Sequence, residues 1–426
     1  MRAKIKALAE DKFIKNNTIY FLGSLLVAFF SYLYHPILGR MMPVADFGEV
    51  QTLLSLVAQT GVFLGIFNVI VVNIVANAQG DAEKLKIISR LYRFALFVSL
   101  SFALLLALSS PWLESFFNFH SFWPFISLAV IIAISVSFTF RRAYLQAVRD
   151  FWAVSIAGII GTAGRLIFAI ILVYLGFSSF GAISAIVLAD LLIMLFVFQK
   201  TRERFSLKLE AQTEKPRGLK RELKYGFLIF CASGFVTFLY TSDILIVKHY
   251  FPATEAGLYS GIATIARAIF FITGSVAGVL LPSIKIRNSF TKNHRIFKKA
   301  LALITLIGGT TGLTFSLFSD TVIRYSIGTK YTQMAEFLPK MSLFLFLVSV
   351  INLFFVYFLA LREYLLIPIA FLSGLLIAGL SFFRHENLNT VINNFLFSSI
   401  FTLVWLLLLY WKRSRKVNAS NIVRTN

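Results

Sequence analysis

Two short stretches decide the fold: Leu38-Gly-Arg-Met-Met-Pro-Val-Ala-Asp-Phe-Gly-Glu-Val50 and Lys248-His-Tyr-Phe-Pro-Ala-Thr-Glu-Ala-Gly-Leu-Tyr-Ser260. The proline, the acid and the glycine of the first stretch recur 209 residues later in the second: Pro43, Asp46 and Gly48 correspond to Pro252, Glu255 and Gly257. Each copy joins one long apolar segment to the next. A turn that is used twice at equivalent places predicts a duplicated unit, which is a common plan among membrane transporters.

The composition is that of a polytopic membrane protein. Of the 426 residues, 58% are hydrophobic and 14% are charged, and the mean hydropathy is +0.80. Soluble domains are rarely this apolar. The net charge of +22 could indicate a nucleic-acid partner. We expect none, because the basic residues flank apolar segments as the positive-inside rule requires.

The sequence shows no pattern typical of an enzyme or a metalloprotein. The single cysteine, Cys231, excludes an internal disulfide and a cysteine-based metal site, and the five histidines have no metal-ligand spacing. No phosphate-binding loop and no Ser/His/Asp constellation is present. Asp46 and Glu255 could form a carboxylate pair, but each precedes an apolar segment, where an acid complements a helix N-terminus. We therefore expect no cofactor, no bound metal and no catalytic residues.

Twelve apolar segments are each long enough to cross about 30 Å of hydrocarbon. They are expected at 17–39, 48–75, 90–110, 121–140, 152–175, 179–198, 225–247, 256–282, 299–319, 335–360, 364–383 and 391–411. The predicted fold class is an all-α polytopic membrane protein with 12 transmembrane helices in two six-helix lobes. Because six is even, both lobes enter the membrane in the same sense, which makes the repeat parallel.

The expected domains follow from this division. They are a basic N-terminus (1–16), an N-lobe (17–199), a linker (200–224), a C-lobe (225–411) and a C-terminal tail (412–426). With the N-terminus in the cytoplasm, 33 of the 41 basic residues fall in cytoplasmic segments and six in outer connections. This asymmetry predicts that both termini are cytoplasmic. The N-terminus is not expected to be a cleaved signal, and it could be an interfacial helix or a basic tail.

Polar side chains follow one face of the first and of the seventh span. They are Asn17, Tyr20, Ser24, Ser31 and His35 in the first, and Ser233, Thr237, Tyr240 and Asp243 in the seventh. Two polar faces in equivalent spans suggest two walls of one central cavity, since ionisable groups are costly in hydrocarbon. Ordinary interhelical hydrogen bonding is the alternative. Asn68 in the second span is a weaker candidate for the cavity wall.

Three further ionisable residues lie near the middle of predicted spans. Arg267 could bind a phosphate through paired hydrogen bonds, and its alternative is an internal ion pair. Arg165 and Asp190 are expected to pair with each other across adjacent helices. In the alternative, Asp190 or Asp243 binds a coupling proton or cation. The glycines before Arg165 (Gly158, Gly161 and Gly164) predict close helix packing and not a nucleotide loop.

The two quoted stretches, together with a first span beginning near Asn17 and Leu281-Pro282 at the inner end of the eighth, resemble the polysaccharide transporter family. These are flippases of lipid-linked oligosaccharides in the multidrug/oligosaccharidyl-lipid/polysaccharide exporter superfamily. The resemblance covers the whole chain in length and topology. It implies two lobes around a V-shaped central cavity, where an undecaprenyl-diphosphate-linked sugar unit crosses from the inner to the outer leaflet by alternating access.

The resemblance also implies roles for particular residues. Cationic residues of the cavity meet the diphosphate or acidic sugars, which points to Arg267 first, with Arg40, Lys248 and Arg165 behind it. The full expected cavity set is Arg267, Asp243, His35, Arg165, Asn68 and Tyr240, and the expected ion-coupling residues are Asp190 and Asp243. The expected outer gate consists of Arg40, Pro43, Gly48, Lys248, Pro252 and Gly257.

The expected function is flipping of repeat units for O-antigen, capsule or exopolysaccharide biosynthesis in the cell (inner) membrane. The expected partners are the lipid-linked oligosaccharide, the lipid bilayer and, as a further option, a polysaccharide polymerase and a chain-length regulator. Lipid II flippases usually have two additional C-terminal spans, so a peptidoglycan role is less expected. The alternatives are a cation-coupled multidrug exporter of the same superfamily and, less expected, a membrane glycosyltransferase or polymerase.

Overall fold

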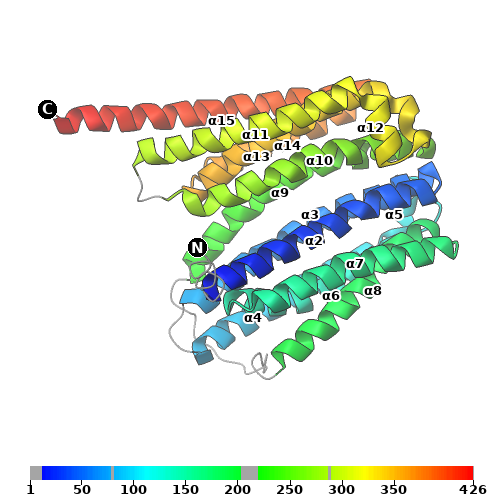
Figure 1. Ribbon diagram of the computed structural model, residues 1–426, viewed down its shortest axis with the longest axis horizontal. Coiled ribbons are helices and arrows are strands. Elements are labelled where there is room, and N and C mark those ends of the chain that lie inside the picture. Colours follow the sequence, from blue (N-terminus) through cyan, green and yellow to red (C-terminus); the bar gives the residue numbers. More distant parts are fainter. Residues whose placement is uncertain (1–11, 78–80, 203–218, 286–288, 426) are drawn as a thin grey trace, which may run out of the picture. The chain divides into compact units, whose positions relative to one another are not determined.

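The computed structural model describes residues 12–77, 81–202, 219–285 and 289–425, and every regular element in these ranges is a helix (Figure 1). The chain divides into two compact units, Met1–Gly226 and Phe227–Asn426. Most of the segment for which an interfacial helix was considered, and most of the expected linker, lie outside the described residues. The finer domain boundaries stay predictions.

The first unit is built from seven described helices that precede the expected linker. They are α2 (Lys12–Met41), α3 (Val44–Asn77), α4 (Asp81–Leu108), α5 (Ser110–Phe116), α6 (Trp123–Ala147), α7 (Phe151–Tyr174) and α8 (Ser178–Thr201). The second unit follows, with α9 (Leu219–Tyr250) crossing the boundary between the two. Its other elements are α10 (Ala253–Ser283), α11 (Phe290–Leu317), α12 (Ser319–Ser326), the 3-10 helix η1 (Thr329–Phe337), α13 (Leu338–Ala360), α14 (Leu366–Phe383) and α15 (Leu388–Thr425).

Twelve of these helical segments are long and apolar enough to cross a membrane, which confirms the predicted number of spans. In the third span α4 begins at Asp81 and not at 90, and the ninth span has an error of the same size, since α11 begins at Phe290 and not at 299. Its first three turns carry Lys292, Arg295 and Lys298, so the helix continues beyond the apolar run that marked the span. Ser289 caps this helix by accepting a hydrogen bond from the Lys292 backbone N–H at 3.3 Å.

The repeated turn is shorter than the sequence indicated. Only Met42 and Pro43 separate α2 from α3, and only Phe251 and Pro252 separate α9 from α10. The helices of the second and eighth spans begin four and three residues before the expected 48 and 256, because the acid of each copy already lies in the following helix. Asp46 and Glu255 are in the first turns of α3 and α10, which confirms their expected place at helix N-termini.

The 209-residue repeat extends well beyond this turn. The last residues of α2 and α4 recur 209 residues later as the last residues of α9 and α11. The starts of α3, α4 and α5 recur at the same offset as the starts of α10, α11 and α12. Neither short helix, α5 or α12, was predicted. Because both follow the third span of their half, they are part of the duplicated plan and not an irregular loop.

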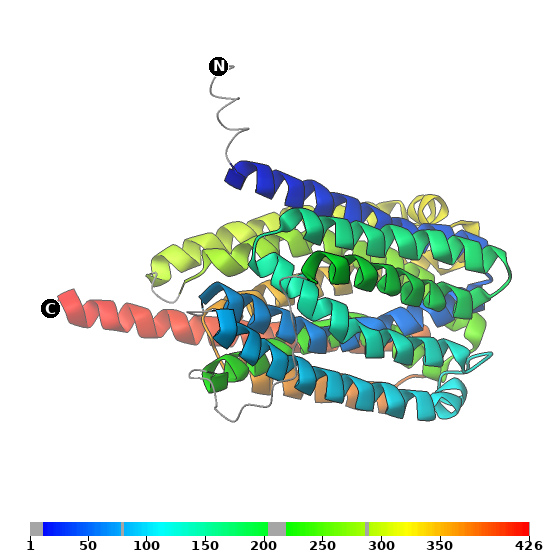
Figure 2. The same cartoon turned by 90° about the horizontal axis from the view of Figure 1, so that it is seen from below.

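Close packing around α7 holds the first unit together, and α7 lies against α2 and α8 (Figure 2). A Cβ added at Gly158 would lie 2.9 Å from Val27 Cγ2, and one at Gly161 would lie 2.6 Å from Ile193 Cδ1. Because these approaches leave no room for a methyl group, the prediction that the glycine repeat packs helices closely is confirmed.

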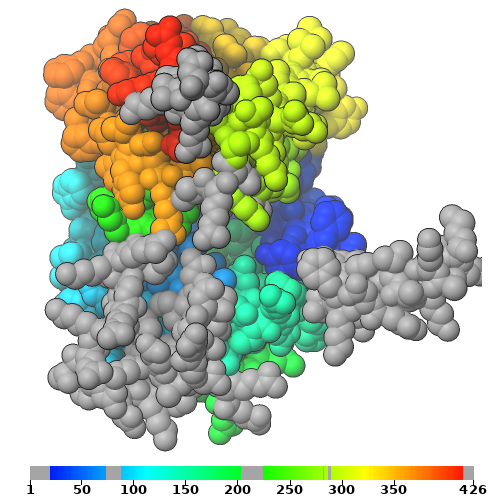
Figure 3. Space-filling view, turned by 90° about the vertical axis from the view of Figure 1, so that its left-hand side faces the viewer, coloured from blue at the N-terminus to red at the C-terminus, as the bar shows by residue number. Residues whose placement is uncertain are grey.

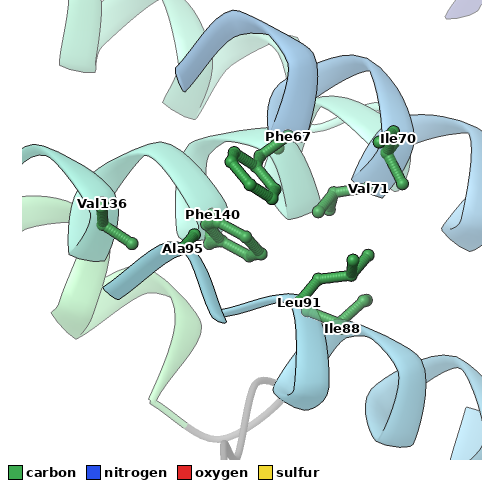
Figure 4. Close-up of a cluster of buried hydrophobic side chains, with 9 residues drawn as sticks. Phe67, Ile70, Val71, Ile88, Leu91, Ala95, Val136 and Phe140 are labelled. Atoms are coloured by element: carbon green, nitrogen blue, oxygen red, sulfur yellow. The ribbon is translucent and has the colours of Figure 1, made fainter. Parts of the chain in front are cut away.

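A second part of this core joins α3, α4 and α6. The cluster contains Phe67, Ile70, Val71, Ile88, Leu91, Ala95, Val136, Phe140 and Ala143 (Figure 4). Phe67 and Phe140 pack with their ring centres 5.6 Å apart. These contacts fix the position of α3, whose N-terminal part carries the acid and the glycine of the first repeat copy.

The second unit is organised around α13, which packs against α10, α11 and α15. Tyr331 of η1 is fully buried and lies against α10 at Gly261. At the opposite end of α13, Arg413 of α15 forms a salt bridge of 3.0 Å with Glu363, in the connection to α14. Figure 3 looks onto this end of the unit, where the start of α11 (yellow-green) and the region of α13 and α14 (orange) reach the surface.

Candidate functional site

A buried ion pair lies inside the second unit, between α9 and α10. Arg267 Nη2 donates to Asp243 Oδ1 at 2.8 Å, and the Tyr259 hydroxyl donates to Asp243 Oδ2 at 3.3 Å. Asp243 is fully buried and Arg267 is only 7% exposed. The internal ion pair, which was the alternative for Arg267, is therefore what this structure contains. The Nε of Arg267 has no hydrogen-bond partner among the described residues.

Aromatic rings extend this pair along α9 and α10. The Arg267 guanidinium lies over the Tyr240 ring at 5.9 Å from its centre, and Tyr240 stacks on Phe270 at 4.6 Å. Tyr240 and Asp243 share one face of α9, as their spacing predicts. The predicted site residues Arg267, Asp243 and Tyr240 therefore form one cluster.

The first unit places its own buried arginine differently. The Arg165 guanidinium lies over the Tyr34 ring, 4.4 Å from its centre, and the Tyr34 hydroxyl donates to the Ala182 carbonyl at 3.0 Å. Arg165 and Asp190, both in the described part of the chain, interact electrostatically across α7 and α8 but form no salt bridge, so the expected direct pair is absent. They come near each other because Gly164, beside Arg165, allows α7 to approach Ala189, beside Asp190.

The remaining predicted residues are spread over both units. His35 Nδ1 lies 3.0 Å from Nε2 of the buried Gln51, so His35 is held between α2 and α3. Asn68 is half-buried in α3. Arg40, just before the first repeated turn, is exposed. Lys248, just before the second repeated turn, is fully buried. The substrate-binding and gating roles of all these residues stay predictions.

The two repeated turns have the same pattern of exposure. Pro43 and Pro252 are exposed, and Gly48 and Gly257 are buried five residues later. The carbonyl of each proline accepts a backbone hydrogen bond at 3.0 Å from the residue four positions on. These bonds start α3 and α10 in the same way.

The structure brings together one cluster that sequence spacing missed. Asp46 and Glu49 of α3 meet His120 of the α5–α6 loop, and the three ligand-type atoms lie within 4.8 Å of one another. His120 Nδ1 is 2.9 Å from Glu49 Oε1 and 3.6 Å from Asp46 Oδ1. The histidine spacing in the sequence gave no sign of this group, and the expectation of no bound metal stays a prediction. His120 is 71 residues away from Glu49, so no local motif could have revealed the cluster.

Two serines at the start of α8 hold the other carboxylate oxygens of this cluster. Ser178 donates to Asp46 Oδ2, and Ser179 donates to Glu49 Oε2 at 2.5 Å. The backbone N–H of His120 donates to Glu49 Oε1 at 2.9 Å. Glu49 is only 1% exposed, so these bonds offset the cost of burying its charge.

Comparison with known proteins identifies a family and a relative that matches part of the chain. A family model described as "Polysaccharide biosynthesis protein" matches residues 37–336. A protein of Escherichia coli (strain K12), described as an O-antigen transporter, is 25% identical over 171 residues, which are 38% of this chain. The chain spans about two fifths of that relative's length, 41%.

Solved structures share the fold at low sequence identity. The inward closed conformation of the lipid II flippase MurJ has a TM-score of 0.69 and 15% identity, covering 95% of this chain and 91% of that chain. An inward-facing multidrug resistance MATE family transporter of the MOP superfamily has a TM-score of 0.66 and 17% identity, covering 91% and 95%. The MATE multidrug transporter DinF-BH has a TM-score of 0.69 and 11% identity, covering 96% and 98%.

Proposed function

The chain belongs to the polysaccharide biosynthesis protein family, with the fold of MOP superfamily transporters, and from this premise we propose that it is a lipid-linked oligosaccharide flippase. It moves undecaprenyl-diphosphate-linked repeat units from the inner to the outer leaflet by alternating access, for O-antigen, capsule or exopolysaccharide biosynthesis. The diphosphate and the sugars cannot cross hydrocarbon unaided, because burying unpaired charge and unsatisfied hydroxyls is costly.

The observation that carries this proposal is the buried Arg267–Asp243 pair. An arginine deep within a membrane span is expensive, and such residues usually serve a substrate or ion pathway. Arg267 keeps donors beyond the one that binds Asp243, including an Nε without a partner among the described residues. A diphosphate offers the planar, bidentate acceptors that a guanidinium prefers. In our proposal, Arg267 exchanges Asp243 for the diphosphate during transport.

This exchange assigns a second role to Asp243. When the diphosphate takes Arg267, the Asp243 carboxylate would be left buried, without its counter-charge, beside an anion. Uptake of a proton by Asp243 relieves that cost, and its release restores the ion pair once the substrate has left. Asp243 is therefore our proposed coupling residue, and Tyr259 stays hydrogen-bonded to it in either state.

A cation-coupled multidrug exporter is the second candidate function. The same fold includes MATE transporters, and the first unit contains the buried carboxylate of Asp190 near Arg165. In that case Asp190 would bind the coupling proton or cation, and the substrate would be an organic cation. The family match and the O-antigen transporter relative favour the flippase.

The proposed setting is the cell (inner) membrane, with both termini in the cytoplasm. Twelve candidate spans support a multi-pass membrane protein, and the distribution of lysine and arginine supports the orientation. A polysaccharide polymerase and a chain-length regulator are the proposed protein partners, because a flipped repeat unit must be polymerised on the outer side. The proposed activity is transport without catalysis.

The test is complementation in a strain that lacks its own repeat-unit flippase, with surface polysaccharide as the readout. Arg267→Ala is expected to abolish the polymer, while Arg324→Ala, an exposed arginine of α12 in the same unit, retains it. Membrane levels of both variants are measured by immunoblot, so that loss of the protein is distinguished from loss of transport.

A double variant separates substrate binding from stability. Asp243→Asn/Arg267→Gln leaves no unpaired charge in the buried site, so it is expected to insert and fold, but it lacks the cation that holds the diphosphate. We expect no polymer from it. Normal polymer levels from the double variant would remove Arg267 from the substrate site and reduce the pair to a structural contact. Cation-dependent drug efflux from vesicles that contain the protein, with no rescue of polymer, would favour the multidrug exporter.

A further inference from the structure

We infer that Asp46, Glu49 and His120 form a binding site for a divalent transition-metal ion, with Zn²⁺ as its probe, at the α2–α3 junction of the first unit. The three side chains supply one imidazole nitrogen and two carboxylate oxygens, a donor set that suits Zn²⁺ and related ions better than Ca²⁺ or Mg²⁺. This inference is independent of the transported substrate.

The geometry of the donor atoms supports three-ligand coordination. Zn²⁺ binds nitrogen and oxygen ligands at about 2.0–2.2 Å, so tetrahedral donors lie roughly 3.3–3.5 Å apart. His120 Nδ1 is 2.9 Å from Glu49 Oε1 and 3.6 Å from Asp46 Oδ1, which brackets that separation. The third pair of donors, on Asp46 and Glu49, also lies within 4.8 Å, so adjustment of these side chains would admit the ion, and water would complete its shell.

The surroundings orient the ligands as a metal site requires. Ser178 and Ser179 hold the carboxylate oxygens that face away from His120, which leaves Asp46 Oδ1 and Glu49 Oε1 directed to the imidazole. Such outer contacts fix the ligands of known metal sites. The His120 side chain is 67% exposed, so an ion can reach it from water. The Glu49 side chain is only 1% exposed, so it supplies a buried negative charge.

Charge balance gives a second reason for a cation at this place. Among the hydrogen-bond and ion-pair partners described for Glu49, His120 is the one group that can become positive. With a neutral imidazole, the buried Glu49 carboxylate has hydrogen bonds from these partners but, within the described ranges of the chain, no counter-charge. A divalent ion supplies that charge, and its binding displaces the Nδ1 proton that His120 donates to Glu49 in its absence.

The fold itself does not require this cluster. The position in the second unit that corresponds to Glu49 is Leu258, 209 residues later and 5% exposed. There the junction is closed by the apolar contact of Tyr331 with Gly261. The polar chemistry of the first unit is therefore an addition to a junction that can be built without it.

The experiment uses the full-length chain, purified in detergent through a tag that contains no histidine and stripped of metal with a chelator. Zn²⁺ is titrated in competition with a chromophoric chelator. We expect one equivalent per chain, bound at least about 100-fold more weakly by His120→Asn, since even the loss of an outer-shell contact costs about 10–100-fold. Ser179→Ala is expected to weaken binding about 10-fold. His385→Asn, at a histidine of the second unit, is the control and should bind as the unmodified chain does.

X-ray absorption of the loaded protein should show one imidazole with oxygen ligands. Zn²⁺ should also raise the unfolding temperature of the unmodified chain and not that of His120→Asn. Because His120 is exposed, its replacement is not expected to prevent folding, and an unfolding transition without metal checks this. The absence of a stoichiometric Zn²⁺ site, or equal affinity in His120→Asn, would overturn the inference.

Discussion

The two units place their carboxylate clusters at different points of the same helix plan. In the first, the second helix begins with Asp46 and Glu49, which bind His120 and two serines of α8. In the second, Leu258 stands at the position of Glu49, and the buried ion pair lies elsewhere on the same two helices, where Arg267 pairs with Asp243. The residue that corresponds to Asp243 in the first unit is Tyr34, whose ring meets Arg165.

Contacts at equivalent places of the two units are made by residues of different chemistry. Both units have a contact between the segment after the short helix and the second helix of the half. Glu49 with His120 provides it in one unit, and Gly261 with Tyr331 provides it in the other. In both units an arginine also contacts the equivalent position of the first helix, which is Tyr34 in one unit and Asp243 in the other. Because the partners differ in chemistry, the two units are expected to respond differently to equivalent substitutions.

The largest expected effect comes from breaking the deep ion pair. Asp243→Ala leaves the Arg267 guanidinium buried without its counter-charge, which should lower the free energy of unfolding by about 3–5 kcal/mol. Denaturation of the purified protein in mixed micelles measures the change. The neutral double variant Asp243→Asn/Arg267→Gln should recover most of the loss. A single variant as stable as the unmodified chain would mean that water reaches this site.

A smaller effect is expected where the second unit closes its junction. A Cβ at position 261 would lie 2.4 Å from Tyr331 Cδ1, and that ring is fully buried. Gly261→Ala should therefore destabilise by about 1–3 kcal/mol through overpacking. Gly274→Ala is the control on the same helix, with no atom within 4 Å of its added methyl group. Thermal unfolding compares the two, and equal midpoints would contradict a tight junction.

A contribution of about 1 kcal/mol is expected from the hydroxyl of Tyr34. Tyr34→Phe keeps the ring beneath Arg165 and removes only the hydrogen bond to the Ala182 carbonyl, which is typically worth about 0.5–1.5 kcal/mol. Tyr34→Leu also removes the cation–π contact and should cost more. If the two variants unfold at the same denaturant concentration, the ring does not stabilise Arg165.

The smallest effect is expected at the exposed helix start of the second unit. Glu255→Gln removes a charge that complements the N-terminus of α10, and this costs at most about 0.3–1 kcal/mol and is screened by salt. Its unfolding midpoint should approach that of the unmodified chain at high ionic strength. Asp46→Asn, which also loses the charge near His120, should be more destabilising. Equal losses at the two positions would mean that Asp46 also acts only through the helix dipole.

Most of the fold could be predicted because it is encoded in local patterns. Apolar length set the number of spans, and the equivalence of Pro43 with Pro252 revealed the duplication. The short helices α5 and α12 were missed because each spans two turns, too few to show a hydrophobic period. The start of α11 was missed because basic residues continue a helix that hydropathy alone ends.

The candidate sites were predictable only where their members share a helix or a known spacing. Tyr240 and Asp243 could be placed on one face of α9, and Arg267 was singled out by the cost of its charge in hydrocarbon. Its pairing with Asp243 depends on how α9 and α10 rotate against each other, which spacing does not specify. The Glu49–His120 contact depends on three segments meeting at one end of the unit, so it required the fold.

The two-residue breaks have a mechanical consequence. An extended chain gains at most about 3.3–3.6 Å per residue, so three Cα steps from Met41 to Val44 span no more than about 10–11 Å. Packed helix axes already lie about 8–10 Å apart. The connection therefore has no slack: α2 and α3 can change their mutual angle, but neither can slide along the other. Because α2 packs on α7 while α3 packs on α6, a tilt of either helix is passed to a different set of neighbours. The same length limit holds for α9 and α10.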